Sequence, residues 1–105
     1  MRISEIQKEI HETAKSKGWW EYPRETPECI ALMHSELSEA LEAYRIGNPM
    51  SKKIPPFSQI EEELGDEVIR ILDYAEHNGF EIGPAIAAKM AYNKTREYRH
   101  GNKKA

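Results

Sequence analysis

The sequence contains little cysteine and no long hydrophobic run. Its one cysteine, Cys29, cannot form an intramolecular disulfide, which is typical of proteins from a reducing, intracellular setting. No stretch approaches the roughly 18 apolar residues that a membrane-spanning helix needs, and the first residues lack the apolar core of a signal peptide. We therefore expect a soluble, cytoplasmic protein with no membrane association.

Several chemical signatures are missing as well. The chain has no glycine-rich phosphate loop and no Cys/His spacing suited to zinc. Ser35 and Ser38 have no evident base partner, and Cys29 falls on an apolar helix face, so nucleophilic catalysis is poorly supported. No alternating strand pattern, repeat or low-complexity segment is present, which leaves helices as the expected structure.

Charge is small in total but unevenly distributed. The net charge is −3, and more than half of the acidic residues lie between Glu28 and Asp73. From Lys89 to the end of the chain there are six Lys or Arg residues and a single acid, Glu97. A short basic helix fits nucleic acid as well as phosphate, but the acidic remainder argues against a nucleic-acid partner.

Four segments have helical periodicity. Ser4 and Gln7 predict a capping box for a first helix that ends near Gly18, and Ser58 and Glu61 predict another for a third helix that ends at Asn78–Gly79. The remaining signals are Thr26 as the cap of the second helix with Pro27 as its first residue, and Gly83–Pro84 as the start of the fourth.

These helices indicate one domain over residues 1–105, all-α, in a four-helix bundle. Glycine and proline within residues 46–57 interrupt the helices with a long connection that could be mobile or cover a site. The tail, residues 101–105, is polar, and we expect it to be frayed. Because apolar residues make up only 39% of the chain, we expect dimerisation to complete the core.

Two pairs of carboxylates are the most informative feature. Glu36 and Glu39 are three residues apart in the second helix, and Glu63 and Asp66 repeat this spacing in the third, so each pair shares a helix face. Both pairs adjoin apolar stripes. Four such acids could hold Mg²⁺, which prefers oxygen ligands, whereas a single pair of this kind is more often an ordinary solvated face.

Two further groups could bind a nucleotide. Lys89, Asn93, Arg96 and His100 fall on one face of the fourth helix and would suit phosphate, although basic residues also favour a helix C-terminus for electrostatic reasons. Trp19 or Trp20 could stack on a base, with His11 nearby as a hydrogen-bonding group. The alternative is that these tryptophans anchor their loop to the core.

The order of these motifs resembles the MazG-like nucleotide pyrophosphohydrolases of the all-α nucleoside triphosphate pyrophosphatase superfamily. The resemblance rests on Glu36-x-x-Glu39, then Glu63-Leu64-Gly65-Asp66, then Lys89-x-x-x-Asn93-x-x-Arg96, with a similar run from Tyr92 to Gly101. It implies hydrolysis of a nucleoside triphosphate to the monophosphate and pyrophosphate, dependence on Mg²⁺ with Mn²⁺ as a substitute, and a homodimer or dimer-based tetramer.

By position, the resemblance implies a role for each motif. The metal-binding acids would be Glu36, Glu39, Glu63 and Asp66. Separately, a free carboxylate of this group could take the proton of the attacking water, and Glu36 and Glu39 are the candidates. Lys89, Asn93 and Arg96 match phosphate- or sugar-binding positions. His11 and Trp20 match base-contacting positions of related deoxycytidine triphosphate pyrophosphatases.

The sequence departs from the family at two positions. Ser35 stands where relatives often have another glutamate, and Arg70 stands where some have an aromatic residue. The missing acid leaves the number of metal ions open. It also leaves open a second class of function, a non-catalytic helical module that binds a nucleotide or a protein and retains a relic of the metal site.

Overall fold

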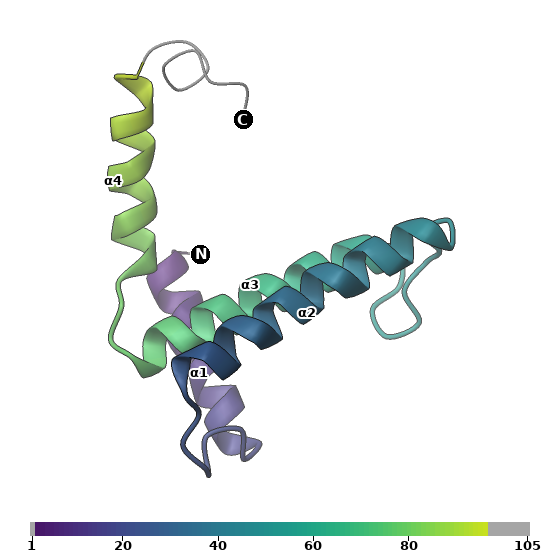
Figure 1. Cartoon of the computed structure of the whole chain (residues 1–105), viewed down its shortest axis with the longest axis horizontal. Coiled ribbons are helices and arrows are strands. Elements are labelled where there is room, and N and C mark those ends of the chain that lie inside the picture. The colour runs from purple at the N-terminus through teal and green to yellow at the C-terminus, as the bar shows by residue number, and fades with distance from the viewer. Residues whose placement is uncertain (1, 97–105) are drawn as a thin grey trace.

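The computed structural model describes residues 2–96 and confirms an all-α protein with four helices (Figure 1). The helices are α1 (Ile3–Ser16), α2 (Thr26–Arg45), α3 (Gln59–His77) and α4 (Ile82–Lys94). Within residues 2–96 the only extended pairing is an isolated bridge between Met50 and Ser58. The tail expected to be frayed, residues 101–105, lies outside the described residues.

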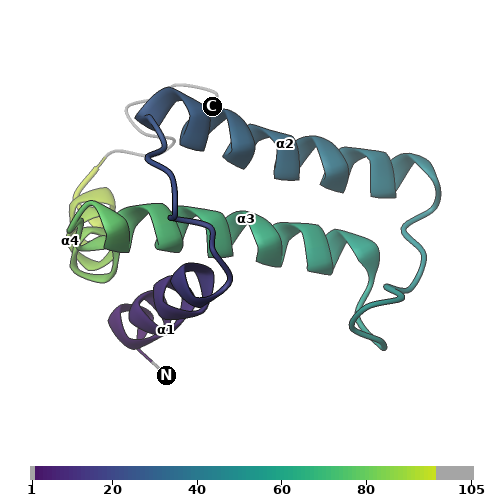
Figure 2. The same ribbon diagram turned by 90° about the horizontal axis from the view of Figure 1, so that it is seen from below.

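The helices form a bundle-like arrangement around α3. The two longest helices, α2 and α3, lie antiparallel and side by side, while α1 packs obliquely against another side of α3 (Figures 1 and 2). The last helix, α4, packs mainly against α1 and projects away from the α2–α3 pair (Figure 1). The α2–α3 pair extends beyond α1 and α4 toward the connection that joins these two helices (Figure 1).

The helix ends correct two of the sequence predictions. Ser58 and Glu61 form the predicted capping box, because the Ser58 hydroxyl accepts from the Glu61 backbone N–H and the Glu61 carboxylate accepts from the Ser58 N–H. The prediction that Ser4 caps α1 is wrong, since α1 begins at Ile3 and Arg2 precedes it. Thr26 is likewise the first residue of α2 and not its cap, since Glu25 occupies that position.

The long connection, residues 46–57, folds back onto the start of α3. Ser51 is 1% exposed, and its hydroxyl donates to Glu62 Oε1 at 2.5 Å. The same hydroxyl oxygen accepts from the backbone N–H groups of Lys53 and Ile54. At the other end, Asn48 Oδ1 accepts from the Ile60 N–H. These bonds hold Lys53 beside the acidic residues at the start of α3.

The apolar core of the described chain is small. Its buried apolar side chains are Cys29, Ala43, Leu72 and Ala75. By contrast, five larger apolar side chains of α2 and α3 are about half exposed: Leu37, Leu41, Leu64, Val68 and Ile69. Among residues 2–96, no helix combines the length and the apolar character that crossing a bilayer requires.

Candidate metal centre

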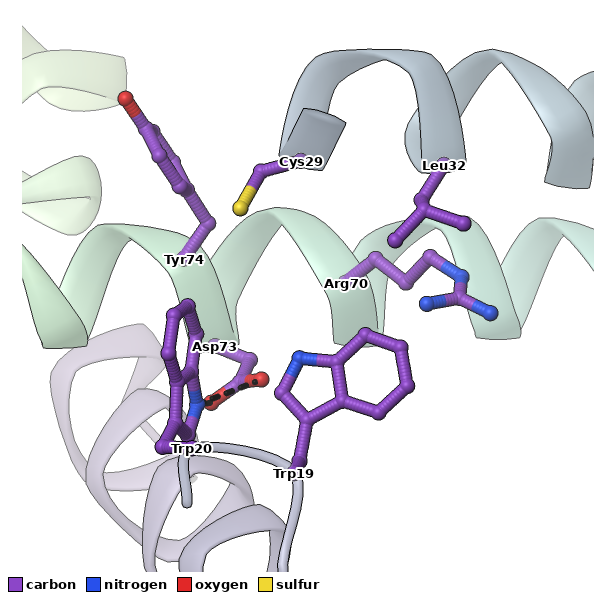
Figure 3. A pocket seen from close by; sticks show the side chains of 7 residues that line it. All are labelled: Trp19, Trp20, Cys29, Leu32, Arg70, Asp73 and Tyr74. Carbon is purple, nitrogen blue, oxygen red and sulfur yellow. Dashed lines mark hydrogen bonds between the residues drawn. The ribbon is translucent and has the colours of Figure 1, made fainter. Parts of the chain in front are cut away.

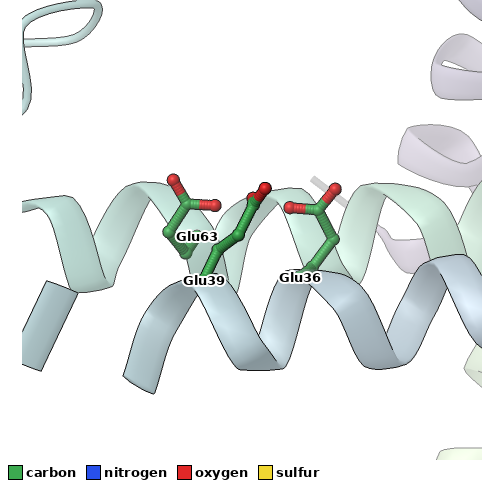
Figure 4. A group of neighbouring side chains, drawn as sticks. All are labelled: Glu36, Glu39 and Glu63. Atoms are coloured by element: carbon green, nitrogen blue, oxygen red, sulfur yellow. The ribbon is translucent and has the colours of Figure 1, made fainter. Parts of the chain in front are cut away.

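The predicted carboxylates of α2 and α3 come together. One carboxylate oxygen from each of Glu36, Glu39 and Glu63 lies within 4.8 Å of the other two, and an overlapping group joins Glu62, Glu63 and Asp66. Figure 4 shows the side chains of Glu36, Glu39 and Glu63 pointing to the same side of the two helices. The four predicted acids and Glu62, hereafter the carboxylate cluster, all line one cleft.

Antiparallel packing explains this meeting. Each helix places acids three residues apart on one face, and the opposite chain directions bring the second acid of α2 near the first acid of α3. Glu39 therefore interacts most strongly with Glu63, and Glu36 with Asp66. The spacing in the sequence predicted that the two acids of each helix share a face. The antiparallel pairing of α2 and α3 brings the two pairs together in one site.

Crowding of negative charge raises the pKa of two of these acids. The pKa of Glu63 is raised from 4.5 to about 7 by burial, by a hydrogen bond with Glu39 and by the charges of Glu39, Asp66 and Glu62. The pKa of Asp66 is also raised, chiefly by burial and then by the charges of Glu36 and Glu62, with Lys53 and Arg70 acting in the opposite direction. A bound cation would relieve this repulsion.

The donor set fits a divalent cation. Within residues 2–96, Glu36 Oε2 and Glu63 Oε2 are buried without a hydrogen-bond partner, and such atoms are rare because burying an unpaired polar oxygen is costly. Both belong to the carboxylate cluster, whose ligand atoms are all oxygens. Mg²⁺ and Mn²⁺ prefer such hard ligands, so the residues present suit either ion.

The cleft beside the cluster is large enough for a nucleotide. Its volume is about 460 Å³, within the range of small-molecule sites. Three basic side chains and one indole line it together with the acids: Lys17, Lys53, Arg70 and Trp19. The cleft thus places cations beside the carboxylates, as a metal-bound anion would require.

Arg70 contacts both the cluster and the aromatic wall of the cleft. Its Nε donates to Glu36 Oε1 at 2.6 Å, and its guanidinium carbon lies 5.1 Å from the Trp19 ring centroid. Arg24 stacks on the same indole at 3.9 Å and forms an ion pair with Glu28. Figure 3 shows Trp19 between the end of α1 and the Arg70 side chain.

His11 and Trp20 lie next to the cleft but serve the packing of α1 on α3. His11 Nδ1 is 2.7 Å from Asp73 Oδ1, and Trp20 Nε1 donates to both oxygens of Asp73 at 2.9 and 3.1 Å. Trp20 also stacks on His77, with ring centroids 3.8 Å apart. The cavity that Trp20 shares with Trp19 holds only about 20 Å³, room for one water (Figure 3). Base contact by His11 and Trp20 stays a prediction.

The basic stripe of α4 is not at the cluster. Lys89 and Asn93 are exposed on α4, and Arg96 follows that helix. None of the three lines the acidic cleft of the described chain, and both Lys89 Nζ and the Arg96 guanidinium lie over the Tyr92 ring. His100 lies outside the described residues. A helical wheel predicts that these side chains share one face of α4, but it gives no information on how α4 packs against the other helices.

Five charged side chains of the cleft were not among the predicted site residues: Lys17, Lys53, Glu62, Arg70 and Asp73. Arg70 and Asp73 follow Glu63 and Asp66 along one flank of α3, so their spacing could have placed them near the site. Lys17 and Lys53 reach the cleft through the end of α1 and through the connection, and no local pattern identifies them. Ser35 is exposed and donates to the Leu32 carbonyl.

No protein-family model matches the chain, and no curated protein or solved structure is significantly similar to it.

Proposed function

We propose that this protein is a Mg²⁺-dependent nucleotide pyrophosphohydrolase of the MazG-like kind, which cleaves a nucleoside or deoxynucleoside triphosphate to the monophosphate and pyrophosphate. The observation that carries the proposal is the carboxylate cluster, in which four acids predicted from two separate motifs line one cleft. Two of their oxygens are buried without a hydrogen-bond partner in the described chain. An accumulation of unpaired acids is costly for stability, so a role for a cation is the simplest explanation.

Four acids would hold the ion: Glu36, Glu39, Glu63 and Asp66. Mg²⁺, or Mn²⁺ in its place, would supply neutralisation of phosphate charge and activation of water there. Of the two candidate bases, Glu36 is engaged by Arg70, whereas Glu39 is exposed to the cleft. We therefore favour the Glu39 carboxylate as the group that accepts the proton of the attacking water.

The basic residues of the cleft suit the leaving pyrophosphate. Lys17, Lys53 and Arg70 line the same cleft as the acids, and cations there would stabilise charge that develops on the phosphate oxygens. Trp19 offers an indole face in the cleft that could pack on a base or ribose. Lys89, Asn93 and Arg96 could reach such a substrate only from another copy of the chain.

A homodimer, or a tetramer of two dimers, is part of the proposal. On the helical wheel, Leu37 and Leu41 lie about 100 to 140° to one side of Glu36, and Glu39 lies about 60° to the other side. Leu64 and Val68 have the corresponding position on α3. An exposed apolar face therefore lies opposite the acidic cleft, where a second copy could cover it without closing the site.

A cytoplasmic setting agrees with this substrate class and with a single unpaired cysteine. The second candidate function is a non-catalytic helical module that binds a nucleotide or a protein partner. It is favoured by one observation, namely that Ser35 does not add an acid to the cluster and bonds to its own helix instead.

The test is a panel of ribo- and deoxyribonucleoside triphosphates incubated with Mg²⁺ in ¹⁸O-labelled water. We expect at least one to give pyrophosphate and a monophosphate carrying the label, which marks attack at the α-phosphorus. Glu63→Gln should abolish turnover, whereas Glu42→Gln, an exposed acid of α2 outside the cleft, should not. Nucleotide binding by calorimetry without release of any product would support the non-catalytic module.

A further inference from the structure

One basic side chain reaches into the carboxylate cluster. Within residues 2–96, the only ion pair made by a cluster acid joins Arg70 of α3 to Glu36 of α2, with Nε 2.6 Å from Oε1. The Glu36 side chain is 8% exposed and that of Arg70 is 29% exposed. This is a partly buried, charge-assisted hydrogen bond, which is stronger than an ordinary surface contact.

The bond leaves Glu36 only half satisfied. Its second oxygen, Oε2, is buried and has no hydrogen-bond partner in the described part of the chain. A guanidinium that binds through Nε alone forgoes the two-pronged contact that arginine makes with a carboxylate in its preferred geometry. Arg70 therefore neutralises Glu36 but contacts only one of its two oxygens. A compact divalent cation could bind this carboxylate more completely.

We propose that Arg70 is an internal counter-ion that competes with a divalent cation for Glu36 and is released into the cleft when the cation binds. The inference rests on the metal dependence of the proposed function. A divalent ion brings twice the charge of a guanidinium and attracts Glu36 together with Glu39 and Glu63. It also repels the Arg70 guanidinium, and because the metal neutralises Glu36, the attraction that holds Arg70 there is lost.

The cleft has room for the released Arg70 side chain. Arg70 lines the cleft of about 460 Å³, and the Trp19 ring beside it can support a guanidinium by cation–π contact. A free guanidinium fork is well suited to phosphate oxygens. Arg70 would then become available to an anionic substrate only in the metal-loaded protein, so the metal would promote binding of the phosphate group.

The direct test follows the Arg70 Nε–H in the wild-type protein by ¹H–¹⁵N NMR, with its resonance assigned from Arg70→Lys. Without metal, the hydrogen bond to Glu36 should protect this proton from exchange with water. Saturating Mg²⁺ should abolish the protection. A proton that stays protected while calorimetry shows bound Mg²⁺ would overturn the inference.

A second measurement compares Mg²⁺ affinity by calorimetry at constant ionic strength. Arg70→Gln, which keeps most of the aliphatic stem, should bind Mg²⁺ about tenfold more tightly because the competing cation is gone. The matched control is Arg24→Gln, which removes an arginine from the other contact with Trp19 and should leave the affinity unchanged. Equal or weaker Mg²⁺ binding by Arg70→Gln would contradict competition.

The outcomes separate this inference from the proposed reaction. Release of Arg70 by Mg²⁺ in a protein that hydrolyses no triphosphate would support the inference and refute the reaction. Hydrolysis by a protein whose Arg70 stays at Glu36 in the presence of Mg²⁺ would support the reaction and refute the inference. If Mg²⁺ does not bind at all, both the inference and the metal dependence fail.

Discussion

Glu39 and Glu63 project from antiparallel helices, and one carboxylate oxygen of each lies within 4.8 Å of the other across the cleft. Burial and the neighbouring acids, Glu39 first among them, raise the pKa of Glu63 to about 7, so a proton reduces the negative charge of the cluster below neutral pH. The proton takes the place of a cation in holding the acids together. A bound metal ion, a proton and the Arg70 guanidinium would each reduce the repulsion among the carboxylates at this site.

The pH dependence of stability follows from Glu63. Its pKa is about 7 in the folded protein and 4.5 ordinarily, so the folded state binds the extra proton between these values. The contribution of Glu63 to stability should therefore fall as pH rises from about 4.5 to about 7. We expect a loss of about 1 to 2 kcal/mol, less than the roughly 3 kcal/mol of a full conversion, because the cleft is open to solvent.

Thermal unfolding in EDTA across this pH range measures the effect. Glu63→Gln should flatten the dependence and stabilise the metal-free protein at pH 8. Adding Mg²⁺ should raise the melting temperature of the wild type most at high pH, where the ligands are ionised, and should do little for Glu63→Gln. The same pH dependence in the wild type and in Glu63→Gln would show that Glu63 does not hold the extra proton in the folded protein.

The capping box of α3 can be tested against the predicted capping box of α1, which the structure does not contain. Ser58→Ala should cost about 1 kcal/mol, because the Glu61 N–H loses its acceptor. Ser4→Ala is the control, since Ser4 has the same sequence signature but does not cap α1. Its urea denaturation midpoint should stay close to the wild-type value. Equal losses in the two variants would argue against the assigned caps.

These helices show what a sequence can and cannot predict. Local chemistry predicts the number of helices and places Glu36, Glu39, Glu63 and Asp66 on helix faces, because periodicity is a property of neighbouring residues. It cannot place Lys53, which depends on how Ser51 folds the connection onto Glu62. The direction of α4 is equally non-local, since that helix is exposed along most of its length and has no single apolar side to fix its position.

Asp73 should matter more for folding than for binding a base. It accepts hydrogen bonds from Trp20 and His11 where α1 packs on α3. Asp73→Ala should therefore lower stability by about 2 to 3 kcal/mol, because buried polar groups lose their partner. His11→Ala should also destabilise the protein, while Glu12→Ala, an exposed neighbour, should not. A stable His11→Ala with a raised KM would instead favour base contact.

Glu67 presents the opposite case, a buried acid that should be dispensable for stability. It is 8% exposed, neither carboxylate oxygen has a hydrogen-bond partner among the residues that the structure describes, and burial together with the charge of Glu36 raises its pKa. Glu67→Leu should stabilise the protein by about 1 kcal/mol at pH 7, as measured by urea denaturation. Glu42→Leu, at an exposed position, should have little effect. A destabilised Glu67→Leu would indicate that the assembled protein provides a partner for this carboxylate.

The apolar face of α2 and α3 predicts the oligomeric state. Leu41 is 50% exposed and Val68 51% exposed, and a lone chain would leave both in water. Sedimentation should show a dimer or tetramer for the wild type, and Leu41→Glu or Val68→Glu should shift it toward the monomer by burying a charge in the interface. Tyr22→Glu is the control, because Tyr22 is 77% exposed but lies in the loop between α1 and α2. A wild-type monomer at micromolar concentration would remove the dimer, and with it any contribution of α4 from a second copy to the cleft.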